Sequence, residues 1–85
     1  MDNLLAILSG LHPDVDFETA NDLIDGGILD SFDLVTIVSE IDEQFGVAIP
    51  AEALTPENFN SAHALYALVE RLLDEVLRLL DLVLV

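Results

Sequence analysis

One serine in this chain lies where a chemical group could be attached to it. Ser31 stands between Asp30 and Phe32, directly before a run of apolar residues with helical spacing, Leu34 to Phe45. A helix N-terminus leaves backbone N–H groups unpaired and carries a partial positive charge, so it accommodates a phosphate group well. The position therefore suits a serine that holds another molecule through a phosphodiester.

The residues that a hydrolase or a metal centre would need are missing or badly spaced. The two histidines, His12 and His63, have no informative spacing to Ser31, and there is no Gly-x-Ser-x-Gly motif. We expect His12 to be a solvated loop residue and His63 a surface or half-buried packing residue. Residues 14–25 begin like a calcium-binding loop, but Thr19 replaces the glycine and an aspartate replaces the final glutamate. The sequence thus predicts no catalytic residue and no dedicated metal site.

Size and charge narrow the class of protein. Eighty-five residues make one domain with little room for an internal active-site cavity. Seventeen acidic residues against two arginines give a formal net charge of −15, which repels nucleic acid and anionic lipid and attracts proteins with basic patches. There is no cysteine, and the acidic start lacks the basic region of a signal peptide. We therefore expect a cytoplasmic monomer whose partners are proteins.

The spacing of apolar residues predicts an all-α protein. Three segments have helical periodicity: residues 4–11, 34–45 and 61–76. Asp30 and Gly46 suit the two ends of the middle helix, and Thr55-Pro56-Glu57 is typical of the start of a short helix. Residues 14–27 have only scattered apolar side chains and are expected to form a long loop. We predict a four-helix bundle with three longer helices, one short helix and a long first connection.

The last ten residues, 76–85, are apolar apart from Arg78 and Asp81. The segment is too short, and too near other acidic residues, to span a membrane. We expect it to continue the last helix or to form a tail beyond a domain of residues 1–75. An alternative is a hydrophobic patch for self-association or for a partner.

The middle helix has one apolar stripe, formed by Leu34, Ile37, Val38, Ile41 and Phe45. Apolar and acidic residues outside this stripe surround the serine. Phe32 and Val35 are apolar but lie off the inner face of the predicted helix. Phe32 either packs on the long loop and caps the bundle, or is a partly exposed anchor for a partner protein. Asp33, Glu40 and Glu43 also lie off the stripe, where they would steer a basic enzyme toward the helix.

Four stretches of the chain form a family pattern: Gly27-Ile28-Leu29-Asp30-Ser31-Phe32-Asp33, Glu43-Gln44-Phe45-Gly46, Ile49-Pro50 and Pro56-Glu57-Asn58-Phe59. With the helix spacing, the loop length and the acidic balance, this pattern resembles the acyl carrier proteins, a family of phosphopantetheine-binding carriers. The resemblance extends from the first helix to about Leu73. The family's familiar Asp-Ser-Leu triplet has phenylalanine in its third position here.

The resemblance implies a carrier and not an enzyme. Ser31 would accept 4'-phosphopantetheine from coenzyme A through a separate phosphopantetheinyl transferase, and the thiol of that arm would hold acyl or aminoacyl groups as thioesters. Asp30 would flank the attachment site, and Phe32, Val35, Asp42 and Glu43 fall at positions that partners read, with Asp33 beside them. The partners would be the transferase, a loading ligase and acyl-processing enzymes with basic docking patches.

The sequence leaves three hypotheses for the function open, two of them subtypes of carrier. The first is a carrier for fatty acid, polyketide or related biosynthesis. The runs Gly-Gly-Ile-Leu-Asp-Ser-Phe and Phe-Gly-Val-x-Ile-Pro also resemble D-alanine carrier proteins of teichoic acid modification. From a different class, an unmodified acidic helical module for protein interactions would share the same bundle.

Overall fold

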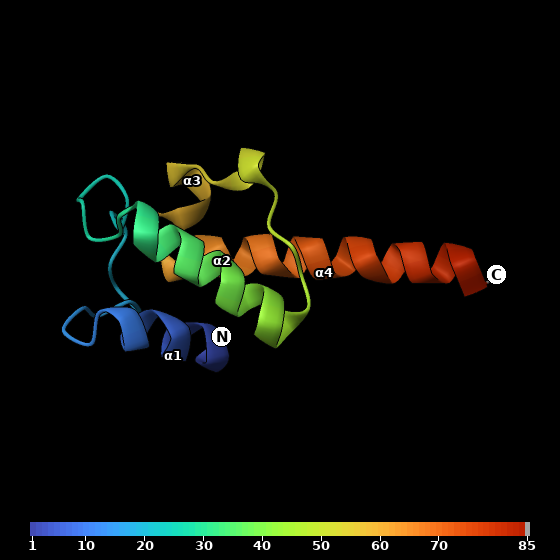
Figure 1. The fold of residues 1–85 in the computed structure, drawn as a ribbon, viewed down its shortest axis with the longest axis horizontal. Helices are drawn as coiled ribbons and strands as arrows, with labels where there is room; N and C mark the ends of the chain where they lie inside the picture. The colour runs from blue at the N-terminus through green and yellow to red at the C-terminus, as the bar shows by residue number, and fades with distance from the viewer. Residues whose placement is uncertain (85) are drawn as a thin grey trace.

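The computed structural model describes residues 1–84, and in this range every regular element is a helix (Figure 1). The elements are α1 (Asp2–Leu11), α2 (Ser31–Phe45), the short 3-10 helix η1 (Ala51–Ala53), α3 (Pro56–Phe59) and α4 (Ala62–Leu84). The prediction of an all-α bundle with three longer helices and one short helix is confirmed. The 3-10 turn was not predicted.

The core lies where α1 and α2 meet the first half of α4. Helix α1 packs against both α2 and α4, and α3 packs against α4 (Figure 1). The fully buried side chains at these contacts are Leu4, Leu8, Ile37, Ile41, Phe59, Leu65 and Val69. The predicted apolar stripe of α2 thus holds its most buried residues in its middle, while Leu34 and Val38 are half-buried.

The long connection between α1 and α2 is held down by apolar anchors and by one asparagine. Its buried side chains are Phe17, Leu23 and Leu29. At the end of α3, the Oδ1 of Asn60 accepts hydrogen bonds from the backbone N–H groups of Ile24, at 2.9 Å, and Asp25, at 3.1 Å. The Nδ2 of Asn60 donates to the Asp25 carboxylate at 3.0 Å. These contacts fix the segment that leads into Ser31.

Helix α4 extends past the rest of the bundle. Figure 1 shows its C-terminal half pointing away from the other helices. The apolar side chains exposed along this part are Val76, Leu77, Leu79, Leu80, Leu82 and Val83. Arg78 forms an ion pair with Asp74, one turn earlier, at 3.1 Å. None of the described helices is long and apolar enough to cross a membrane. Val85, which the sequence groups with this segment, lies outside the described residues.

Candidate functional site

Ser31 is the first residue of α2 and is exposed. Asp30 precedes it as the N-cap in an extended conformation. The backbone N–H of Asp33 donates to the Asp30 carboxylate at 2.9 Å, and the backbone N–H of Asp30 donates to the Asp33 carboxylate at 3.2 Å. This reciprocal capping box defines where the helix begins. The serine hydroxyl is therefore presented to solvent from a fixed helix start, where the backbone favours a negatively charged group.

His12 is part of this arrangement, which corrects the expectation of a solvated loop residue. It caps the C-terminus of α1, and its Nε2 lies 2.8 Å from the Oδ2 of Asp33. That hydrogen bond raises the pKa of His12 and lowers the pKa of the Asp33 carboxyl. Within residues 1–84, no hydrogen bond joins His12 to Ser31. The histidine therefore acts on the helix start, 21 residues along the chain, and not on the serine directly.

The predicted partner-reading residues differ in how they are presented. Phe32 is 84% exposed and Val35 is 70% exposed, so neither packs into the bundle. This excludes the alternative in which Phe32 caps the bundle by packing on the long loop. Asp42 and Glu43 are exposed further along the same helix. The carboxylate of Asp33, in contrast, is half-buried and occupied by internal hydrogen bonds.

An apolar groove of about 340 Å³ includes the serine in its lining. It is lined by Ser31, Leu34, Val35 and Val38 from α2 and by Leu54 from the segment after η1. Most of its surface is carbon, so it suits the hydrocarbon part of a molecule attached beside it. Sequence reasoning missed Leu54, because no local pattern shows that the residue after a 3-10 turn faces α2.

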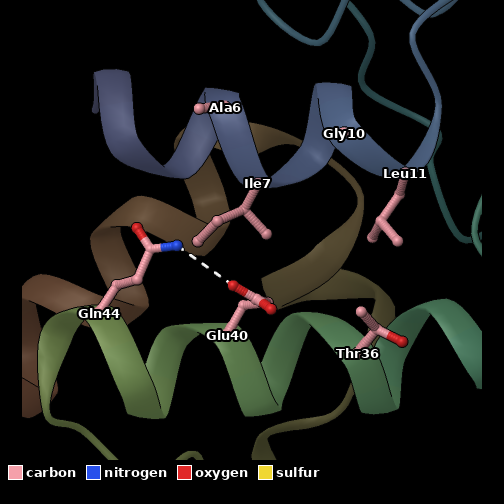
Figure 2. A pocket seen from close by; sticks show the side chains of 7 residues that line it. All are labelled: Ala6, Ile7, Gly10, Leu11, Thr36, Glu40 and Gln44. Atoms are coloured by element: carbon pink, nitrogen blue, oxygen red, sulfur yellow. Dashed lines mark hydrogen bonds between the residues drawn. The ribbon is translucent and has the colours of Figure 1, made fainter.

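A second groove, of about 300 Å³, lies between α1 and α2 and does not include the serine. Figure 2 shows Glu40 and Gln44 of α2 facing α1, where Ala6 and Gly10 leave space. The Nε2 of Gln44 donates to the Glu40 carboxylate at 3.2 Å. Glu40 is half-buried and accepts this hydrogen bond, so its carboxylate is less available to a partner than those of the exposed Asp42 and Glu43.

Comparisons with known proteins give a family and a likeness to solved structures. The chain matches the family model described as "Phosphopantetheine attachment site" over residues 3–72. It is also similar to a chain in a solved structure described as "Crystal structure of FAD-dependent dehydrogenase". The identity is 36%, the TM-score is 0.63, and the match covers 85% of this chain and 100% of that chain. No match was found among curated proteins.

Proposed function

The chain belongs to the phosphopantetheine attachment family, a family of carriers that hold a covalent 4'-phosphopantetheine group, and on this premise we propose that Ser31 is the residue that carries it. The observation that supports the choice is the placement of an exposed hydroxyl on the first residue of α2. In the proposed modification, the Ser31 oxygen bonds to the phosphorus of the phosphopantetheine part of coenzyme A. The serine proton and the nucleotide part of coenzyme A leave.

The other three serines are less suitable. Ser9 and Ser39 are exposed but lie inside helices, away from a free N-terminus. Ser61 precedes α4 and is half-buried, and its hydroxyl accepts a hydrogen bond from the Ala64 N–H at 3.0 Å. Ser31 alone among them combines exposure with the first turn of a helix.

The surroundings of Ser31 fit the attached group. The chain has no arginine or lysine near residue 31 in sequence, and the N-terminal dipole of α2 favours a phosphate at this position. When bound, the group supplies a thiol that holds acyl or aminoacyl cargo as a thioester. The apolar groove lined by Ser31, Val35 and Leu54, among others, offers a place for a hydrocarbon part of the arm or cargo.

We assign partner recognition to the exposed side of α2. Phe32 and Val35 offer apolar contacts next to the attachment point, and Asp42 and Glu43 offer negative charge further along. A partner with a basic patch around an apolar pocket would match both. Phosphopantetheinyl transferases, loading ligases and acyl-processing enzymes are the partners that we propose.

The cargo that we propose is an acyl or aminoacyl thioester in fatty acid, polyketide or related biosynthesis, with D-alanine for teichoic acid as the alternative. A specific observation favours one kind of processing enzyme. The related chain, matched over its whole length, is part of a structure described as that of an FAD-dependent dehydrogenase. We infer that an enzyme of this kind is a partner of this carrier. It would remove two hydrogens from the bound thioester and reduce FAD to FADH2.

Intact-protein mass spectrometry tests the attachment. Incubation with coenzyme A, Mg²⁺ and a broad-specificity transferase should add one phosphopantetheine to the wild type and none to Ser31→Ala. Ser39→Ala, which removes an exposed serine from the same helix, should be modified like the wild type. If the wild type gains no mass with several transferases, the proposal is wrong and the unmodified interaction module is the better reading. The loaded carrier can then be offered to a dehydrogenase, where loss of two hydrogens supports the inferred partner.

A further inference from the structure

One carboxylate links the end of α1 to the start of α2. The Oδ2 of Asp33 lies 2.8 Å from the Nε2 of His12 and accepts the backbone N–H of Asp30 at 3.2 Å. The backbone of His12 is held at the end of α1, because its N–H donates to the Leu8 carbonyl at 3.0 Å. The side chains are only 30% exposed for His12 and 16% exposed for Asp33. The His12–Asp33 pair is thus a partly enclosed contact between two helices.

The capping box of α2 depends on the orientation of this carboxylate. Asp33 must face Asp30 for the two reciprocal hydrogen bonds to form, and Ser31 lies between these residues in the chain. Two carboxylates held together repel each other, and a positive charge at His12 offsets that repulsion. Without the charge, the Asp30 and Asp33 carboxylates have no counter-ion, and their repulsion weakens the capping box.

We propose that His12 is a positioning residue for Ser31: when protonated, it holds Asp33 in the capping box and fixes the first turn of α2, and when neutral, it lets that turn loosen. This inference rests on the proposed attachment at Ser31. It makes the presentation of the serine depend on pH, through a residue that does not touch the serine.

The direction of the pH effect follows from the charges around the pair. The charged groups that raise the pKa of His12 are all acidic: Asp33, Asp14 and Asp30. The hydrogen bond to Asp33 is the largest cause of the raised pKa of His12, and desolvation partly opposes it. Protonated His12 therefore contributes its full stabilisation of the folded state below pH 6.5, the ordinary pKa of histidine. This stabilisation is lost as the pH rises through the higher pKa of His12 in the folded protein.

The acidic limit comes from the carboxylate. The pKa of Asp33 is lowered mainly by the same hydrogen bond. Ionised Asp33 therefore contributes its full stabilisation of the folded state above pH 3.8, the ordinary pKa of aspartate, and this stabilisation is lost as the pH falls through the lower pKa in the folded protein. Between pH 3.8 and pH 6.5, His12 should therefore be protonated and Asp33 ionised, so that the ion pair stabilises the folded state fully. Above this window, the start of α2 should become progressively less well held.

Backbone NMR of the unmodified protein tests the coupling without any enzyme. In the wild type, the amide resonances of Ser31 and Phe32 should shift with the titration of His12. In His12→Gln, which keeps a hydrogen-bond donor but no charge, that titration should vanish. The matched control is His63→Gln, which removes the other histidine from an exposed position and should leave the titration unchanged. An unchanged titration of the two amides in His12→Gln would overturn the proposal.

The rate of modification gives the functional readout. Dividing the wild-type rate by the His12→Gln rate at each pH cancels the pH dependence of the transferase itself. The ratio should be about two- to fivefold near pH 6, the effect of a partly exposed ion pair, and should approach one at high pH. A ratio that does not vary with pH refutes the positioning role. If no variant is modified at all, the attachment at Ser31 fails, while the amide titration still decides whether His12 controls the helix start.

Discussion

Replacing Phe32 by alanine should weaken complexes of this protein without weakening its fold. The side chain is 84% exposed, so its removal leaves no cavity in the core. Substitutions at such surface positions usually change the free energy of unfolding by less than about 0.5 kcal/mol. An aromatic side chain that contributes little to folding and lies next to the proposed attachment point is expected to contribute to binding instead.

The size of the binding effect can be estimated from the exposed fraction. Complete burial of a phenylalanine side chain is worth about 1.5–3 kcal/mol. Since 84% of Phe32 remains to be covered, a partner that encloses it would gain about 1.3–2.5 kcal/mol. At 1.4 kcal/mol for each factor of ten, Phe32→Ala should raise the dissociation constant by about eightfold to sixtyfold.

Two measurements on the same samples test this prediction. Urea unfolding gives the change in stability, and the kcat/KM of loading by a transferase gives the change in recognition. The control is Ile41→Val on the same helix, where a buried methyl group is lost. It should cost about 0.5–1.5 kcal/mol of stability and leave loading unchanged. The reasoning fails if Phe32→Ala lowers stability by more than about 1 kcal/mol, or if neither a transferase nor a cargo enzyme discriminates against it.

Three further predictions concern the core, the acidic surface and the long loop. Ile41→Ala should destabilise the fold by roughly 2–5 kcal/mol, because Ile41 is fully buried; a loss below about 1 kcal/mol in urea unfolding would contradict that burial. Charge reversal at Asp42 and Glu43 should slow transfer from a basic enzyme at low salt without lowering the unfolding midpoint, and equal rates would count against electrostatic docking. Asn60→Ala should cost about 1–3 kcal/mol and speed amide hydrogen exchange in the loop before α2, since two backbone N–H groups lose their acceptor; unchanged exchange would show that the loop is held otherwise.

The parts of this protein that depend on local sequence could be predicted. The period of apolar residues located the three longer helices, because residues on one face of a helix recur every three or four positions. Asp30 and Gly46 marked the ends of α2 through capping preferences, and Gly46 has the left-handed conformation that favours glycine, with φ of 70°. The placement of Ser31 at a helix start follows from these local rules.

Contacts between distant segments could not be read in this way. The pairing of His12 with Asp33 depends on the path of the connection between α1 and α2, and periodicity does not describe that path. The same holds for the contact of Asn60 with Ile24, 36 residues away. Whether Phe32 is covered was also undetermined, because an apolar residue off the inner stripe can pack on a loop or face solvent. Each of these features needs the three-dimensional arrangement of the helices.

The exposed side of α2 combines two kinds of residue that should act at different stages of binding. Long-range attraction from Asp42 and Glu43 acts before contact and is screened by salt, so it changes mainly the association rate. Burial of Phe32 and Val35 occurs only in the complex and changes mainly the dissociation rate. A carrier that visits several enzymes in turn needs fast arrival and limited residence. A net charge of −15, together with the highly exposed Phe32 and Val35 beside the proposed attachment serine, meets both needs.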